Sequence, residues 1–162
     1  MFNRLKVAIL RFLYRTISAR LWRKEALELP HSVLHVATDE GSIGLRMYIG
    51  EGGDEQPLIV YLHGGGWVIG DVGTHHALCQ SLCLKTGCTV VSVDYRLAPE
   101  HPCPAAHNDA LTASQWIAQR LSELGPNNGS FILAGDSAGA NLATCTALAL
   151  SPRERELLAG EI

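Results

Sequence analysis

A serine flanked by glycines could act as a nucleophile at residues 135–139, which are Gly-Asp-Ser-Ala-Gly. The Gly-x-Ser-x-Gly pattern is frequent by chance and indicates a nucleophile only between a buried strand and a helix. Both neighbours fit, because residues 131–133 are Phe-Ile-Leu and residues 137–150 are rich in Ala and Leu. We therefore predict that Ser137 lies in a tight turn with a strained backbone, at a helix N-terminus that faces developing negative charge. The alternative is that Asp136 or Ser137 only caps the helix.

Three consecutive glycines, Gly64, Gly65 and Gly66, lie between His63 and Trp67, directly after an apolar run. Such a loop is costly in conformational entropy, so its backbone is expected to approach another group closely. A phosphate site is disfavoured, because no Lys-Ser/Thr follows and the Gly-x-Gly-x-x-Gly spacing is absent. An oxyanion hole fits better, since N–H groups of such a loop join the N–H of the residue after the nucleophile. Each such donor typically lowers the barrier by about 3–4 kcal/mol.

The segments around these motifs alternate between strand and helix patterns. Residues 33–37 and 45–49, separated by a turn at 39–42, indicate a β-hairpin. Strands are predicted at 58–62, 89–93 and 131–133, and helices at 74–86, 105–124 and 137–150. A hairpin followed by alternating strands and helices is typical of an α/β fold with a mostly parallel sheet covered by helices.

The chain resembles the hormone-sensitive-lipase-like family of α/β-hydrolases, which includes bacterial esterases and arylacetamide-deacetylase-like enzymes. The resemblance rests on three ordered motifs: His-Gly-Gly-Gly-Trp-Val-Ile-Gly-Asp at 63–71, Asp-Tyr-Arg-Leu-Ala-Pro-Glu-His-Pro at 94–102, and the serine motif at 135–139. It covers roughly residues 30–162. It implies an N-terminal amphipathic cap-type helix in 1–30 and a partial α/β-hydrolase domain in 31–162, with a sheet of about five strands.

The resemblance also assigns roles to residues. Ser137 would be the nucleophile, and the N–H groups of Gly64, Gly65 and Ala138 would form the oxyanion hole, with Gly66 keeping the loop tight. His63 would tie down the glycine loop rather than move protons, and Trp67 would be either a wall of the acyl pocket or a core aromatic. Cys103 stands where the family often has an aromatic residue. The remaining motif residues would support neighbouring loops or the serine turn: Asp71, Asp94, Tyr95, Arg96, Glu100, Gly135, Asp136 and Gly139. For the four of these that lie in 94–100, direct substrate contact is the alternative.

The base that a serine nucleophile needs is missing from the pattern. This fold orders its triad as Ser, then Asp or Glu, then His, but no His and no Asp follow Ser137. His101 or His107 would serve only in a different order, so we expect them to be surface or supporting residues. Residues 157–162 resemble the start of the family's next core strand, which indicates truncation. We therefore expect little activity from the chain alone, an unpaired edge on strand 131–133, and poor solubility or stabilisation by a partner.

These features predict a carboxylic ester hydrolase that acts through an acyl-serine intermediate on small esters with short- or medium-chain or aryl groups. No cofactor or metal is implied. The first alternative is a non-catalytic ligand-binding or remnant module, as in plant gibberellin receptors, which resemble this family and lack the histidine. An amidase or peptidase would use the same groups. The oligomeric state stays open.

Charge and composition restrict the partners. With 47% hydrophobic residues among 162, the chain can bury one core. Residues 1–30 hold seven Lys/Arg and two acidic residues, whereas the remainder is acidic, which disfavours nucleic acid. In the N-terminal segment, apolar residues recur at helical spacing, so we expect this helix to pack on the protein's own body, with an anionic membrane surface as the alternative. These residues are Leu5, Ile9, Phe12, Leu13, Ile17 and Leu21.

The cysteines indicate a cellular compartment. Five cysteines in a chain large enough to fold without disulfides favour a reducing environment, and hence the cytoplasm. His75, Cys79 and Cys83 follow one another at intervals of four and could form a metal-binding face on a helix. No second cluster completes four ligands, so we expect buried thiols rather than a zinc site. The longest apolar run, residues 7–10, is too short for a signal sequence or a membrane span.

Overall fold

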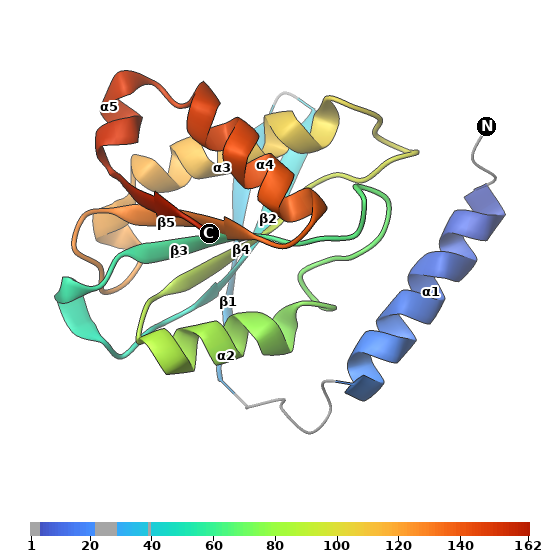
Figure 1. Ribbon diagram of the computed structural model, residues 1–162, viewed down its shortest axis with the longest axis horizontal. Coiled ribbons are helices and arrows are strands. Elements are labelled where there is room, and N and C mark those ends of the chain that lie inside the picture. Colours follow the sequence, from blue (N-terminus) through green and yellow to red (C-terminus); the bar gives the residue numbers. More distant parts are fainter. Residues whose placement is uncertain (1–3, 22–28, 39) are drawn as a thin grey trace.

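A six-stranded sheet organises the computed structural model, which describes residues 4–21, 29–38 and 40–162 (Figure 1). The strand order is β1-β2-β4-β3-β5-β6. β1 (Ser32–Thr38) and β2 (Gly41–Tyr48) form the antiparallel hairpin, and β2 runs antiparallel to β4 (Val90–Asp94). β3 (Leu58–Leu62), β4, β5 (Phe131–Gly135) and β6 (Leu158–Glu161) are parallel to one another. The predicted α/β fold class is confirmed.

Helices cover both faces of the sheet. α2 (His76–Thr86) lies on one face, and α3 (Ala105–Ala118) and α4 (Ala138–Ala149) lie on the other (Figure 1). Two apolar clusters fill the space between these layers, and the cluster on the α2 side includes the buried thiols of Cys79 and Cys83. All five residues of β3 are buried, as expected for a central parallel strand.

The connections explain why the sheet has a crevice. The chain passes from β3 to β4 on one side and then places β5 on the other side of β3. Right-handed crossovers in opposite directions put the intervening helices on opposite faces, as α2 and α3 are. The loops after β3 and β5 therefore leave the carboxyl edge at a topological switch point, where open α/β sheets bind their ligands.

Two helical segments differ from the predicted pattern. The helix expected over 105–124 ends at Ala118, and a separate 3-10 turn, Leu121–Glu123, buries Leu121. α5 (Pro152–Glu156) was not predicted, although its capping box is visible in the sequence. Ser151 accepts a hydrogen bond from the Glu154 N–H, and Glu154 accepts one from the Ser151 N–H at 2.8 Å. A second 3-10 turn, Gly53–Glu55, precedes β3.

The edge of the sheet beyond β5 differs from expectation. Residues 131–133 do not keep an unpaired edge, because β6 pairs with them in parallel. The Ile162 N–H donates to the Leu133 carbonyl at 2.9 Å, and the Phe131 N–H donates to Leu157 at 2.9 Å. The C-terminal tail thus completes a sixth strand, and the open edge on this side of the sheet is that of β6.

The N-terminal helix α1 (Arg4–Leu21) forms as predicted, but it is rotated relative to the expected packing. Val7 and Ser18 are buried and Arg11 and Tyr14 are half-buried, so these positions face the body. They are offset by about two residues, roughly 200° around a helix, from most of the apolar stripe. The helix therefore packs on the body as expected, but through these positions, while its apolar stripe is exposed. No helix among the described residues is long and apolar enough to cross a bilayer.

Candidate active site

Ser137 lies at the sharp turn between β5 and α4. Its backbone has φ 52° and ψ −114°, which confirms the predicted strain, since this region costs a residue with a side chain about 1–3 kcal/mol. The turn is closed by the Gly139 N–H, which donates to the Asp136 carbonyl at 2.8 Å. A Cβ on Gly139 would lie 1.9 Å from the Leu62 carbonyl oxygen. The glycine therefore permits β3, β5 and α4 to meet beneath the serine.

The glycine loop follows β3 and approaches the serine turn from the other side of the switch point. Gly65 and Gly66 have φ of 125° and 59°, which glycine adopts without steric cost. The Val68 and Ile69 N–H groups both donate to the Gly65 carbonyl, at 3.1 and 3.0 Å, so the loop folds back on itself. A Cβ on Gly65 would lie 2.1 Å from the Ile69 carbonyl oxygen. Backbone crowding thus explains the glycines at this position.

One expected oxyanion donor is already occupied. The Gly64 N–H donates to Asp136 Oδ1 at 2.9 Å, so Gly64 is not free to bind an oxyanion, contrary to the expectation. The physical reason is that the Asp136 carboxylate, in the serine turn, already accepts the hydrogen bond that this N–H can donate. Among the described residues, the N–H groups of Gly65, Gly66 and Ala138 have no acceptor. Gly66, expected to keep the loop of the oxyanion hole tight, is thus itself a donor candidate.

Asp136 connects the two glycine motifs. Its Oδ1 accepts hydrogen bonds from the Tyr61 hydroxyl at 2.7 Å and from Gly64, and it lies 3.5 Å from His75 Nε2. Burial alone would raise the pKa of Asp136, but the hydrogen bonds from His75, Tyr61 and Gly64 outweigh burial and lower it. The carboxylate therefore stays ionised and holds the glycine loop against the serine turn.

Tyr61 and His75 take part in this network although the sequence did not indicate it. Tyr61 stands in a run of strand residues with nothing to mark its hydroxyl, and His75 was considered only as part of a metal-binding face. The described residues contain no group of three or more His, Cys, Asp or Glu side chains placed to hold a metal ion. Alternation along β3 points Tyr61 to the α2 face, where His75 begins the helix. The direction in which Tyr61 points can be predicted only once it is known which residues of β3 face which side of the sheet.

His63 holds the glycine loop from within the core. The residue is fully buried, and its Nδ1 lies 2.9 Å from the Gly64 carbonyl oxygen. The Tyr95 hydroxyl donates to the His63 carbonyl at 2.6 Å, and the two rings are stacked with centroids 4.2 Å apart. Burial lowers the pKa of His63 to about 4, so its ring is neutral near pH 7. These contacts support the expected structural role.

Other motif residues join distant segments. The guanidinium and backbone N–H of Arg96 bind the buried carboxylate of Asp109 on α3, with Nη2 2.7 Å from Oδ1. Arg96 also contacts Glu40 in the β1–β2 turn. The carboxylate of Glu100 accepts hydrogen bonds from both terminal nitrogens of Arg11 on α1, at 3.1 and 2.8 Å. Arg96 and Glu100 thus support neighbouring elements, as expected.

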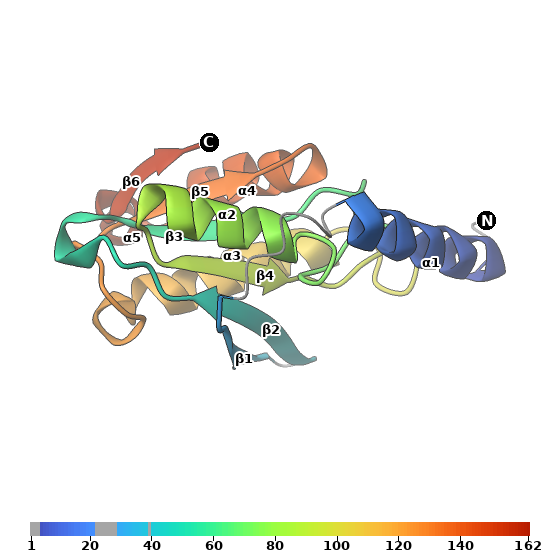
Figure 2. The same cartoon turned by 90° about the horizontal axis from the view of Figure 1, so that it is seen from below.

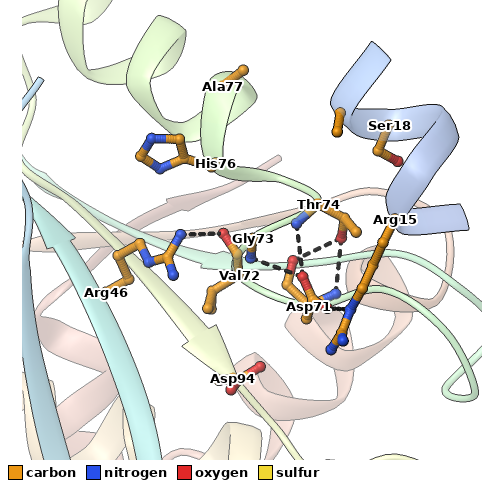
Figure 3. Close-up of a pocket in the computed structure, with 11 residues that line it drawn as sticks. Arg15, Ser18, Arg46, Asp71, Val72, Gly73, Thr74, His76, Ala77 and Asp94 are labelled. Carbon is orange, nitrogen blue, oxygen red and sulfur yellow. Dashed lines mark hydrogen bonds and ion pairs between the residues drawn. The ribbon is translucent and has the colours of Figure 1, made fainter. Parts of the chain in front are cut away.

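Asp71 and Asp94 line a cavity of about 670 Å³ between α1 and the ends of β2 and β4 (Figure 3). Asp71 caps the segment before α2, accepting from the Thr74 N–H at 2.7 Å, and it pairs with Arg15 at 2.6 Å. Burial would raise the pKa of Asp71, but these bonds lower it. Burial raises the pKa of Asp94, and the nearby Asp71 carboxylate adds to that rise. Ser137 does not line this cavity.

A second cavity, of about 260 Å³, adjoins Gly66 on the α3 side. Trp67 lines it, stacks on His107 with centroids 6.3 Å apart, and also packs against the main core. Trp67 is therefore both a cavity wall and a core aromatic. Cys103 and His101 also line this cavity, so an exposed thiol lies where the family often has an aromatic residue.

No described residue is placed to deprotonate the serine. The Ser137 hydroxyl has no hydrogen-bond partner among the described side chains. His101 and His107 line the cavity beside Trp67 rather than contacting Ser137. The arrangement can present a nucleophile and bind an oxyanion, but the described residues do not contain the base.

Comparisons with known proteins agree with this geometry. A family model described as an alpha/beta hydrolase fold matches residues 59–162. The chain is 40% identical over 137 residues to Esterase LipI of Mycobacterium tuberculosis, covering 77% of this chain and 43% of that protein. It is 32% identical over 149 residues to the acetyl esterase of Salmonella schwarzengrund, covering 92% and 45%.

Solved structures give the same result. The hyperthermophilic esterase from the archaeon Pyrobaculum calidifontis superposes with a TM-score of 0.86 at 39% identity, covering 96% of this chain and 50% of that one. EstE1, a thermostable carboxylesterase cloned from a metagenomic library, superposes with a TM-score of 0.82 at 35% identity, covering 96% and 53%. The chain thus spans about half the length of the proteins that it matches.

Proposed function

Because the chain belongs to the α/β-hydrolase fold family, as its hormone-sensitive-lipase-like motifs indicated, we propose that it carries the nucleophile and oxyanion hole of a carboxylic ester hydrolase. The observation that carries this proposal is the strained Ser137 at the N-terminus of α4, with three unoccupied N–H groups at the same switch point. Relatives named as esterases support ester hydrolysis as the reaction class.

The proposed chemistry has two steps. Ser137 Oγ attacks the ester carbonyl carbon, its proton passes to a base and then to the departing alcohol, and an acyl-serine remains. Water then attacks the acyl group, releasing the carboxylic acid and restoring the hydroxyl. In both steps the N–H groups of Gly65, Gly66 and Ala138, with the dipole of α4, stabilise the oxyanion. Asp136 positions the loop and takes no proton, because its pKa is lowered.

The proposal requires a base that acts on Ser137 from outside the described residues. With no base among the described residues, acylation and deacylation should both be slow, because both steps need proton transfer. Small imidazole-type bases can substitute for an absent histidine when the site is open. Ser137 is exposed, so an added base can reach it.

The experiment uses p-nitrophenyl acetate and intact-mass measurement, with and without imidazole. We expect one acetyl group on Ser137, added faster when imidazole is present. With p-nitrophenyl acetate and imidazole together, the unmodified chain should be acetylated faster than the Ser137→Ala variant. Ser122→Ala is the matched control, since Ser122 is also exposed but lies in the 3-10 turn Leu121–Glu123, outside the two glycine motifs. Equal labelling of the Ser137→Ala variant, or a label on other residues only, would contradict the assignment.

A second candidate is a non-catalytic ligand-binding module. The observation in its favour is that no described base contacts Ser137. Under this alternative, an ester or its carboxylate product binds beside the glycine loop, but no acetyl-serine accumulates even with imidazole. Ligand-detected NMR with the uncleaved ester separates the two functions, because the binding module gives saturation transfer without release of alcohol.

The substrate class and the compartment are part of the same proposal. We place short- or medium-chain and aryl esters first, with amides as competitors that only an assay separates, and no cofactor enters the chemistry. The cavity of about 260 Å³ adjoins Gly66, one of the proposed oxyanion donors, and has room for a small group. All five cysteines are unpaired thiols, which supports function in a reducing compartment such as the cytoplasm.

A further inference from the structure

One side of α1 exposes a continuous set of large apolar side chains, here called the outward face. It consists of Ile9, Leu10, Phe12, Leu13 and Ile17, which are 51%, 48%, 69%, 49% and 53% exposed. Elsewhere, exposed large apolar residues occur singly on separate elements, such as Leu84 on α2 and Leu148 on α4. Isolated exposed residues are ordinary, whereas a contiguous set marks an interaction surface.

Polar contacts fix this orientation of α1. Arg11 donates to the carbonyls of Val68 and Ala98 at 2.8 and 2.9 Å, and it also pairs with Glu100. Arg15 pairs with Asp71. Turning the outward face toward the body would break all of these bonds and expose Val7. The helix is therefore held by its polar side, with its apolar side chains exposed.

The charge of α1 indicates what kind of surface fits the outward face. The helix contains five basic residues and no acidic residue. Lys6 and Arg20 are exposed, and each lies three positions from an outward-face residue, Ile9 and Ile17, so each flanks the face. Arg11 and Arg15 are compensated by Glu100 and Asp71. Packing the outward face against its own copy would bring Lys6 and Arg20 of the two copies together, and α1 has no acidic residue to compensate them. An anionic partner has no such penalty.

We propose that the outward face of α1 docks on an anionic lipid surface. Its apolar side chains would enter the boundary between head groups and acyl chains, while Lys6 and Arg20 extend to the phosphates. The helix would lie in the interface, because no described helix is suited to span a bilayer. The acidic body would be repelled by the same lipids, and this leaves α1 as the side that faces the membrane.

This docking would place the membrane beside the candidate site. α1 is held against residues that follow β3 and β4, namely Val68, Asp71 and Ala98, so it lies at the carboxyl edge of the sheet (Figure 2). If the proposed esterase function holds, on which this consequence rests, esters dissolved in the membrane would reach Ser137 from that side. The docking itself does not depend on catalysis.

The test measures binding of the 162-residue chain to vesicles by flotation. We expect binding to vesicles of phosphatidylcholine with phosphatidylglycerol, weakened by raised salt, and little binding to phosphatidylcholine alone. The Ile9→Gln/Phe12→Gln variant should bind these vesicles at least about tenfold more weakly, since two large apolar side chains leave the interface. Glutamine keeps the helix propensity high, and circular dichroism checks that α1 remains folded.

Matched controls make the outcome specific. Leu84→Gln/Leu148→Gln removes two exposed leucines from other elements and should leave binding unchanged. Lys6→Gln/Arg20→Gln should lower binding to the anionic vesicles only. Ser137→Ala should bind as the unmodified chain does, so loss of the esterase function and loss of docking are separate results.

Three results would overturn the proposal. The first is no binding of the unmodified chain to anionic vesicles. The second is equal binding of the Ile9→Gln/Phe12→Gln variant and the Leu84→Gln/Leu148→Gln control. The third is a dimer in solution that the Ile9→Gln/Phe12→Gln substitution dissolves, which would assign the outward face to a second copy of the chain.

Discussion

At the residue scale, single polar groups hold the candidate site together. Asp136 Oδ1 accepts from Tyr61 on β3 and from Gly64 in the loop, while its own backbone forms the serine turn. His63 lies beneath that loop with its ring buried against Tyr95. A change at either residue should therefore act on the position of the glycine N–H groups rather than on proton transfer itself.

His63 should make the protein sensitive to mild acid. The pKa of the folded-state ring is lowered from 6.5 to about 4, so the unfolded chain binds the proton first as the pH falls. Stability should be fully present above about pH 6.5 and decline toward pH 4, by about 3 kcal/mol at 1.36 kcal/mol per pKa unit. Urea denaturation across this range measures it. The His63→Gln variant should be less stable at neutral pH and have a flatter pH profile, and an unchanged slope in that variant would contradict the assignment.

The strained backbone at Ser137 should lower the free energy of unfolding of the protein. The mirror image of its φ and ψ is an ordinary extended conformation, so glycine adopts the same backbone without strain. The Ser137→Gly variant should be more stable than Ser137→Ala by about 1 kcal/mol, after the higher entropy of the unfolded glycine chain is subtracted. Thermal unfolding of the two variants compares them directly. If the alanine variant proves the more stable one, the strain is not present in solution.

At the element scale, Arg96 joins three parts of the fold: the end of β4, the hairpin turn at Glu40 and the buried Asp109 of α3. The Arg96→Met variant should lose about 3–5 kcal/mol, because the Asp109 carboxylate would stay buried without its partner. Glu40→Gln removes the exposed partner and should cost less than about 1 kcal/mol. Chemical denaturation distinguishes the two, and similar losses would mean that the buried pair does not dominate.

Elements with strong local signals were predictable, and those that depend on tertiary contacts were not. β3 has the predicted bounds because five apolar residues end at a glycine loop. The strain at Ser137 was predictable from its place between a strand and a helix. The rotation of α1 was not, because the arginines that anchor it find partners on distant loops. The Gly64 donor was likewise misassigned, since only the folded structure brings Asp136 against it.

At the scale of the whole molecule, the sheet has open edges at both ends of its strand order, β1 and β6. Ile162, which directly follows β6, is a large apolar residue with 77% of its surface exposed. Open strand edges next to apolar surface promote pairing between chains. The expectation of poor solubility or of a stabilising partner therefore stands as a prediction, with β6 rather than β5 as its origin.

Self-association through β6 can be tested at its exposed positions. Ala159→Lys places a charge on the open edge and should raise the fraction of monomer, measured by light scattering as a function of concentration. Leu84→Lys on α2 is the control, because it adds the same charge away from the edge. A monodisperse unmodified chain that unfolds cooperatively would argue against an adhesive edge.

The close packing at Gly139 makes it possible to distinguish residues retained for the fold from residues retained for the reaction. A Cβ there would overlap the Leu62 carbonyl, so selection for a folded chain alone retains glycine, whatever the protein does. Two positions earlier, Ser137 is exposed, and other small residues would fold as well or better. Drift at residue 137 beside a fixed residue 139 would mark lineages that kept the scaffold and abandoned the reaction. Serine retained in every descendant would mark lineages in which the hydroxyl has remained in use.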